Sequence, residues 1–269
     1  MDAQLLAADS FRVRLNPQTG AAEVRGWARH RSRFTRAVRE AAPGAAGREN
    51  EGRILDRANA FIDDALPRIA AYGAGFPRLE LWNDASGTPA LRLSLRPLPE
   101  LRDTVELRTA GAVRLAHPGR KGPSIARLSE LNRELGAEAL LLDSDGRVLE
   151  GATTSLVWWT DDTDESGCTV AAPSGTAPNR VASVTEALLR DAAQKRPVGR
   201  MPNDRRSGSF SESGPTAAEL TSHEVWAVNA LHGIRTVTSI NGVALPSPVP
   251  QRLAWFREAL DRTWEAIEG

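Results

Sequence analysis

The most informative part of the chain is residues 136–151, which read Gly136-Ala137-Glu138-Ala139-Leu140-Leu141-Leu142-Asp143-Ser144-Asp145-Gly146-Arg147-Val148-Leu149-Glu150-Gly151. A short, uninterrupted apolar run bounded by a turn sequence is typical of a buried strand. The turn Asp143-Ser144-Asp145-Gly146 then leads into a second strand around Val148. We therefore expect a strand, a tight turn and a strand that ends at the carboxylate of Glu150.

Lys121 lies 29 residues before Glu150, in a loop that reads His117-Pro118-Gly119-Arg120-Lys121-Gly122-Pro123. A helix is expected directly after this loop, over residues 124–135. Only two of the 34 basic residues are lysines, Lys121 and Lys195. Because arginine stays protonated and forms no Schiff base, chemistry that needs a primary amine has only these two side chains available.

The rest of the chain predicts helices and strands in two subdomains. Apolar residues at helical spacing indicate helices over residues 27–41, 54–69 and 183–193, and a last amphipathic helix that carries Leu253, Phe256, Leu260, Trp264 and Ile267. Apolar runs and alternation indicate strands near residues 79–81, 91–95, 105–107, 156–159, 224–229 and 236–240. The segment Arg96-Pro97-Leu98-Pro99 is typical of an interdomain connection. We expect an α+β fold with subdomains over residues 1–97 and 98–269.

The composition is that of an ordinary globular protein, with 269 residues, 41% hydrophobic and 25% charged. No apolar run approaches the roughly 18 residues of a membrane span, and the first residues do not read as a secretory signal, so a cytoplasmic location is expected. Equal numbers of basic and acidic residues, 34 each, provide no net charge to attract nucleic acid or an anionic membrane. One cysteine and four scattered histidines argue against a disulfide and a metal site. P-loop, dinucleotide and G-x-S-x-G motifs are absent.

Together these features resemble the class IV aminotransferases, the fold-type IV enzymes that use pyridoxal 5'-phosphate. Members carry a lysine, a helix and then a run close to G-A-D-E-A-L-L-L-D-x-D-G-x-V-x-E-G, similar to residues 136–151. Other family motifs match Asp9-Ser10-Phe11-Arg12-Val13-Arg14 as a strand, His30-Arg31-Ser32-Arg33-Phe34 on a helix, residues 175–182 as a phosphate loop, and Asn229-Ala230-Leu231. The resemblance implies a fold-type IV architecture whose C-terminal subdomain is a pseudo-barrel.

The resemblance also implies a role for each matching residue. Lys121 would condense with the cofactor aldehyde and move the Cα proton of the substrate. Glu150 would keep the pyridine nitrogen protonated, which makes the ring an electron sink. The cofactor phosphate would bind Arg33 and backbone amides at a helix start. The expected cofactor-binding set is Arg33, Lys121, Glu150, Arg180, Val181, Asn229 and Ala230. The implied partners are a small amino substrate and a second copy of the chain in a homodimer.

Three functions are open at this point. Chain size and the segment Asn229-Ala230-Leu231 favour aminodeoxychorismate lyase, which eliminates pyruvate from 4-amino-4-deoxychorismate to give the folate precursor 4-aminobenzoate. A branched-chain or D-amino-acid aminotransferase is the alternative. A non-catalytic homologue is the third, because Ser155 and Val181 replace an asparagine and a threonine of the family motifs, no tyrosine follows Lys121, and only eight residues precede Asp9. A basic group of Arg92, Arg96 and Arg120 has two interpretations: it meets substrate carboxylates, or, as is more common for such a group, it is a solvated face.

Overall fold

The computed structural model describes residues 3–41, 47–83, 88–111, 113–163, 166–171, 179–198, 206–207 and 209–267. The chain forms two compact units. The first comprises Met1–Glu100, Arg120–Ile125 and Trp264–Gly269, and the second comprises Leu101–Gly119 and Ala126–Thr263. The predicted boundary after residue 97 lies close to the first division, but two later segments return to the first unit.

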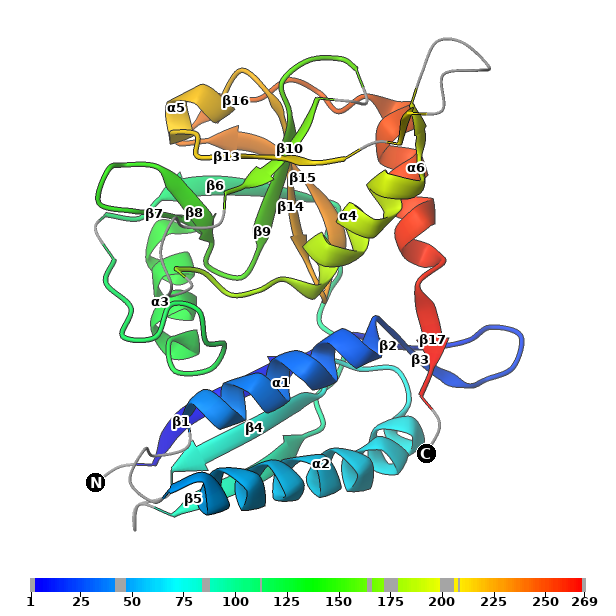
Figure 1. Cartoon of the computed structure of the whole chain (residues 1–269). Helices are drawn as coiled ribbons and strands as arrows, with labels where there is room; N and C mark the ends of the chain where they lie inside the picture. Colours follow the sequence, from blue (N-terminus) through cyan, green and yellow to red (C-terminus); the bar gives the residue numbers. More distant parts are fainter. Residues whose placement is uncertain are drawn as a thin grey trace. The chain divides into compact units, whose positions relative to one another are not determined.

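In the first unit, two helices pack on one face of a three-stranded antiparallel sheet (Figure 1). The strands, in spatial order, are β1 (Gln4–Ser10), β4 (Arg78–Asn83) and β5 (Pro89–Ser94). The helices are α1 (Trp27–Ala41), with the predicted bounds, and α2 (Gly47–Tyr72), which extends the predicted helix at both ends. The apolar stripes of the helices meet the inward-facing strand residues and form a core that includes Phe34, Val38, Ile62, Leu79 and Leu81.

A second, smaller sheet in the first unit joins segments that are far apart in the sequence. In it, β3 (Ala22–Arg25) pairs on one side with β2 (Val13–Leu15) and on the other with β17 (Trp264–Ala266). The single strand predicted over residues 9–14 is therefore wrong. Asp9 and Ser10 end β1, the chain turns at the buried Phe11, and β2 belongs to the other sheet.

The last helix is shorter than predicted. It is α6 (Pro250–Asp261), whereas Trp264 lies in β17 and Ile267 follows that strand. The Trp264 ring lies under three guanidinium groups, 5.6, 4.5 and 4.2 Å from its centre, which belong to Arg12, Arg14 and Arg25. These cation–π contacts and the pairing with β3 hold the segment as a strand, although its apolar residues continue the helical spacing.

A nine-stranded mixed sheet forms the second unit. Eight of its strands follow one another in the spatial order β13 (Ser211–Ser213), β10 (Gly167–Val170), β9 (Ser155–Trp159), β14 (Glu224–Asn229), β15 (Gly233–Ile240), β6 (Thr104–Thr109), β7 (Glu138–Leu142) and β8 (Val148–Gly151). The ninth strand, β16 (Val243–Ala244), pairs with β15 outside this order. β6 is parallel to both of its neighbours. β8 contacts β9 and β10 although they stand far apart in this order, so the sheet curls. This curled sheet agrees with the expected pseudo-barrel, and the predicted α+β class is confirmed.

Two helices cover one face of this sheet. α4 (Val184–Lys195) and α6 contact each other and pack on strands β9, β14 and β15 (Figure 1). The side chain of Ser183 caps α4 by accepting a hydrogen bond from the backbone N–H of Glu186. The buried residues under the two helices include Val157, Trp159, Trp226, Phe256 and Leu260. The other elements are α3 (Ile125–Leu135), α5 (Ala217–Leu220), β11 (Pro197–Val198) and β12 (Arg206–Ser207).

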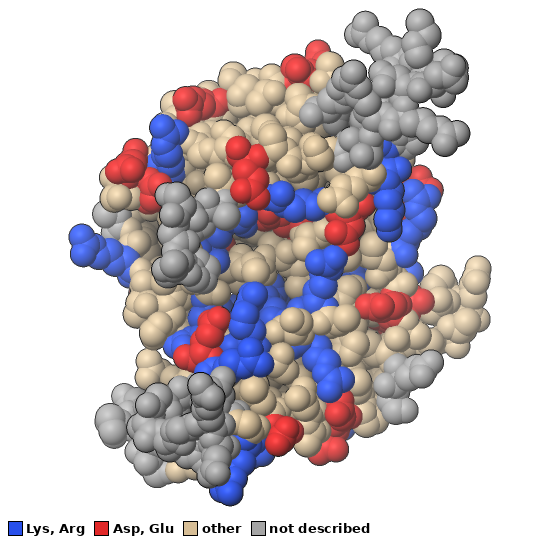
Figure 2. All heavy atoms as spheres, viewed as in Figure 1, with Lys and Arg blue, Asp and Glu red and all other residues tan. Residues whose placement is uncertain are grey.

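Figure 2 shows basic side chains in blue beside acidic ones in red on the visible face of the first unit, in the lower half of the view. Among the described residues, no helix is long and apolar enough to cross a membrane. The same residues contain no group of three or more His, Cys, Asp and Glu side chains that could hold a metal ion.

Candidate active site

Backbone contacts hold Lys121 against strand β1 of the first unit. Its carbonyl oxygen accepts a 2.8 Å hydrogen bond from the backbone N–H of Ala8. The next residue, Gly122, has a φ of +136°, which side chains other than that of glycine rarely allow. A Cβ atom on Gly122 would lie only 2.7 Å from the Cα of Ala7. The loop therefore approaches β1 so closely that only glycine fits at this position.

A buried ion pair joins β1 to α1 beside this loop. The carboxylate of Asp9, which follows Ala8, is fully buried. It accepts hydrogen bonds from Arg33 Nε at 2.6 Å and Arg33 Nη2 at 2.9 Å, which is the side-on bidentate arrangement. The Nδ1 of His30, one helical turn before Arg33, lies 2.7 Å from the same carboxylate. Arg33, predicted to bind phosphate, is thus fixed in orientation by Asp9 and His30.

The electrostatics of this cluster favour a reactive amine. Loss of hydration, followed by the charge of Arg33, lowers the pKa of Lys121 to about 8, against the opposing charge of Asp9. Burial alone would raise the pKa of Asp9, but Arg33 and His30 hold that pKa well below its usual range. Burial also lowers the pKa of His30, although Asp9 opposes the shift. At this pKa about one tenth of Lys121 is the neutral, nucleophilic amine at pH 7, far more than for a lysine with the ordinary pKa near 10.4.

One member of the predicted basic group lies in the same electrostatic environment. Arg96 Nη2 donates to Ser10 Oγ at 3.1 Å, and its charge, like that of Arg78, helps to lower the pKa of Lys121. The other two members of the group have partners of their own: Arg92 packs over the ring of Trp82, and Arg120 donates to the carbonyl oxygen of Glu40.

In the second unit, Glu150 lies in β8 as predicted, and its side chain is buried. The turn that follows is held by a second carboxylate, that of Glu138 in β7. Its Oε1 accepts from the backbone N–H of Thr153 at 2.7 Å and from the hydroxyls of Thr153 and Thr154 at 2.8 and 3.1 Å. Arg235 pairs with Glu138 at 3.3 Å. This network fixes the end of the strand that carries Glu150.

Asn229 ends β14 and organises the turn that contains Ala230. Its side-chain oxygen accepts from the backbone N–H groups of Leu231 and His232, and its Nδ2 donates to the carbonyl oxygen of Thr153 at 3.3 Å. The structure therefore brings Asn229 to the turn that follows Glu150. Both predicted segments belong to one end of the curled sheet.

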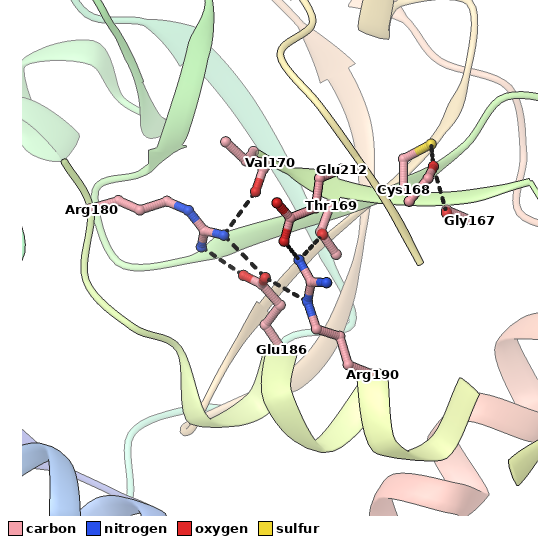
Figure 3. Close-up of polar contacts among 9 residues, drawn as sticks. Gly167, Cys168, Thr169, Val170, Arg180, Glu186, Arg190 and Glu212 are labelled. Carbon is pink, nitrogen blue, oxygen red and sulfur yellow. Dashed lines mark hydrogen bonds and ion pairs between the residues drawn. The ribbon is translucent and has the colours of Figure 1, made fainter. Parts of the chain in front are cut away.

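The guanidinium of Arg180 belongs to a polar cluster between β10 and the start of α4 (Figure 3). Arg180 donates to Glu186 Oε2 at 2.7 Å, to Glu186 Oε1 at 3.1 Å and to the carbonyl oxygen of Val170 at 2.9 Å. Burial opposes it, but the bonds to Glu186 raise the pKa of Arg180. Arg190 Nε also donates to Glu186, at 3.3 Å. The Arg180 side chain thus links the first turn of α4, through Glu186, to β10, through Val170.

The predicted phosphate contact of the Arg180 and Val181 amides stays a prediction. The two residues lie three and two positions before the Ser183 cap, close to the N-terminus of α4. The preceding part of the matched loop, Gly175 to Pro178, lies outside the described residues. Ser155, which replaces the family asparagine, is buried in β9.

Replacing Glu186 by glutamine is expected to destabilise the protein by about 2 kcal/mol, because a charged partner of two guanidinium groups is lost. A urea titration of the unfolding free energy measures the loss. Glu130→Gln is the control: it removes one of the two carboxylate partners of Arg127, in a pair whose side chains are 46–50% exposed, and we expect a much smaller loss of stability. Equal costs for the two variants would contradict a structural role for the Glu186 cluster.

The structure groups the predicted residues in two sets. Lys121 and Arg33 lie in the first unit, and Glu150, Arg180, Val181, Asn229 and Ala230 lie in the second. The charge of Glu150 also acts on Arg180, so these two residues share one environment. Sequence reasoning missed the charged residues that hold the site residues in place, namely Asp9, His30, Glu138, Glu186 and Arg235. An acidic residue inside an apolar strand, as at Asp9, was the available signal, because a buried carboxylate needs a partner.

Similarity to known proteins appears at the level of structure. No family model and no curated protein matches the sequence. A provisionally assigned 4-amino-4-deoxychorismate lyase from Legionella pneumophila has a TM-score of 0.68 and 16% identity, over 96% of this chain and 90% of that chain. A branched-chain aminotransferase from Thermoproteus uzoniensis, solved with norvaline, has a TM-score of 0.70 and 14% identity, over 97% and 90%. A fold IV transaminase from Curtobacterium pusillum has a TM-score of 0.68 and 19% identity, over 97% and 85%.

The chain therefore has the fold of the fold-type IV aminotransferases, as the resemblance of its motifs implies. The match covers nearly the whole chain, so it includes both compact units.

Proposed function

We propose that the protein is a pyridoxal 5'-phosphate enzyme in which Lys121 is the reacting amine. The observation that carries this proposal is the setting of Lys121. The residue is fixed to β1 through Ala8, lies in a cluster of guanidinium groups, and has a pKa lowered to about 8. Structural similarity to enzymes such as the fold IV transaminase supports it.

The residues present fit this cofactor. An aldehyde needs a neutral amine, which the lowered pKa of Lys121 provides. A phosphate needs fixed cations, and Arg33 is held in one orientation beside Lys121 by Asp9. A protonated pyridine nitrogen needs a carboxylate, which Glu150 offers on a strand whose end is fixed by the Glu138 network. The cofactor would supply the electron sink that stabilises negative charge on the substrate carbon.

In this proposal each residue has a defined role, and Lys121 has two, attachment of the cofactor and proton transfer. The Nζ of Lys121 takes the proton from the substrate carbon that bears the amine and returns it later in the reaction. Glu150 holds the proton of the ring nitrogen. Arg33, with the amides of Arg180 and Val181, would hold the phosphate and thereby fix the orientation of the ring. Asn229 and Ala230 form the turn beside Glu150 and help to enclose the ring.

An absorption spectrum of the purified protein with added pyridoxal 5'-phosphate tests the proposal. We expect a new band that borohydride removes, and peptide mapping should then find the cofactor on Lys121. Lys195→Arg is the matched control and should leave both results unchanged. The absence of a band, or labelling at Lys195 alone, would refute the proposal and favour a non-catalytic homologue.

For the reaction, we propose the elimination of pyruvate from 4-amino-4-deoxychorismate. The support is the segment Asn229-Ala230-Leu231, in which Asn229 Nδ2 donates to the carbonyl oxygen of Thr153, and the fold shared with the Legionella pneumophila protein. Lys121 would pass the proton from the amine-bearing carbon to the departing three-carbon group, leaving 4-aminobenzoate. Aminotransferase activity is the second candidate, because the branched-chain aminotransferase from Thermoproteus uzoniensis has the same fold.

Product analysis separates the two reactions. Release of pyruvate and 4-aminobenzoate, in equal amounts, supports the lyase. Formation of glutamate from 2-oxoglutarate and a branched-chain or D-amino acid, without 4-aminobenzoate release, supports the aminotransferase. We also propose a homodimer, which sedimentation at several protein concentrations checks.

A further inference from the structure

The charges around Lys121 come from four elements of the first unit. Asp9 lies on β1, His30 and Arg33 lie on α1, Arg78 lies on β4, and Arg96 follows β5. In this set Asp9 is the acidic group that acts on the lysine, and its carboxylate is fully buried.

The geometry of the ion pair fixes the two opposing charges relative to Lys121. Asp9 follows Ala8, whose N–H donates to the Lys121 carbonyl oxygen, so backbone bonds set the position of the carboxylate. The bidentate bond from Arg33 to both oxygens of Asp9 fixes the plane of the guanidinium. The Nδ1 of His30, in the preceding turn of α1, contacts Asp9 Oδ1, the oxygen that Arg33 Nη2 also contacts. Neither charge can rotate away to be screened by water, because the side chains of Asp9 and Arg33 are 0% and 10% exposed.

We propose that Asp9 and Arg33 act on Lys121 as an opposed pair, in which the guanidinium favours the neutral amine, the carboxylate favours the ammonium form, and His30 fixes the carboxylate in place. Asp9 and His30 are thus positioning residues for the reacting amine. The inference rests on the function proposed above, because it concerns the balance between the amine that attacks the cofactor and the ammonium that returns a proton. It differs from that function in being a property of the protein without cofactor.

The chain offers an unusually direct test, because Lys121 and Lys195 are its only lysines. In a Lys195→Arg background, protein grown with lysine labelled with ¹³C at Cε yields a single labelled side chain. The NMR shift of this carbon, followed between pH 6 and pH 11, reports the protonation of Lys121 without cofactor and without activity. Lys121→Arg removes the label and confirms the assignment.

The two single substitutions should move the titration midpoint in opposite directions. Arg33→Met should raise it by roughly one pH unit and Asp9→Asn should lower it by a similar amount, the size expected for one nearby charge. Arg33→Lys keeps the charge and should restore most of the native midpoint. It adds a second labelled lysine, whose signal the double variant Arg33→Lys/Lys121→Arg identifies. Glu23→Gln is the control, since this carboxylate of the same unit pairs with Arg14 instead, and it should leave the midpoint unchanged.

A purely structural role predicts a different result. If the substitutions only let water into the cluster, both should move the midpoint upwards, towards the ordinary pKa of lysine near 10.4. That outcome, or no movement in either variant, overturns the proposal. If Asp9→Asn does not fold, the double variant Asp9→Asn/Arg33→Met removes both charges together, which buried ion pairs often tolerate. Its midpoint should lie below that of Arg33→Met alone, and an equal or higher value refutes the role of Asp9.

The same experiment keeps the two proposals separate. Opposite shifts together with no cofactor attachment would support the opposed pair and refute the proposed function. Attachment at Lys121 together with parallel shifts would support the function and refute the opposed pair.

Discussion

Replacing Lys121 by alanine is expected to abolish catalysis while the protein stays folded. The lysine is the group proposed both to attach the cofactor and to move the proton, and loss of a positioned acid–base group alone lowers turnover about 10²- to 10⁴-fold. Loss of covalent attachment adds to this. The fold should survive, because the substitution removes a cation from the neighbourhood of Arg33, Arg78 and Arg96, whose charges already disfavour an ammonium at this position.

Two measurements check this prediction. Turnover is measured by 4-aminobenzoate release and by amino transfer, and mass spectrometry after borohydride treatment measures cofactor attachment. Lys195→Ala is the matched control, as it removes the other lysine, which lies at the exposed end of α4. Unchanged turnover in Lys121→Ala would rule out Lys121 as the reacting amine, whatever the fold.

The elements with regular patterns were predictable from sequence alone. Residues 27–41 form α1 with the predicted bounds, and residues 224–229 form β14 in the same way, because a helical stripe or a run of strand-forming residues is a local signal. β17 was not predictable on this basis. Its strand conformation depends on pairing with β3, more than 200 residues earlier, and on arginines that stack on Trp264.

The same distinction applies to the site. Lys121, Glu150 and Arg33 could be proposed as site residues because they belong to recognisable motifs. Their supporting residues were not found, because each acts through a side-chain contact between separate elements. Asp9 reaches Arg33 across 24 positions, and Arg235 reaches Glu138 across 97. An ion pair between such distant residues produces no repeating pattern in the sequence from which it could be predicted.

Gly122→Ala is expected to displace Lys121 without touching its side chain. The new Cβ would lie 2.7 Å from the Cα of Ala7 and 2.8 Å from the backbone N of Ala8, so backbone rather than a flexible side chain would have to move. The φ of +136° adds strain for any residue with a Cβ. Overpacking and backbone strain together should cost roughly 3–5 kcal/mol of unfolding free energy.

The activity of Gly122→Ala should fall for the same reason. Either β1 moves, which shifts Asp9 and with it Arg33, or the loop moves, which breaks the bond between Ala8 and the Lys121 carbonyl oxygen. Urea titration measures the stability, and cofactor attachment at Lys121 measures the site. Both should decrease, and an attachment rate equal to that of the native protein would contradict the close approach of the loop to β1.

Two glycine controls separate the causes. Gly136 also has a positive φ, +63°, but open space around its Cβ position, so Gly136→Ala should cost only the strain, about 1–2 kcal/mol, and leave attachment intact. Gly52 lies in α2 with open space and no positive φ, so Gly52→Ala should stabilise the helix by about 0.5–1 kcal/mol. The difference in unfolding free energy between Gly122→Ala and Gly136→Ala then measures the cost of the close contact with β1. If cofactor attachment at Lys121 falls in Gly122→Ala and not in Gly136→Ala, the contact with β1 sets the position of the proposed reacting amine.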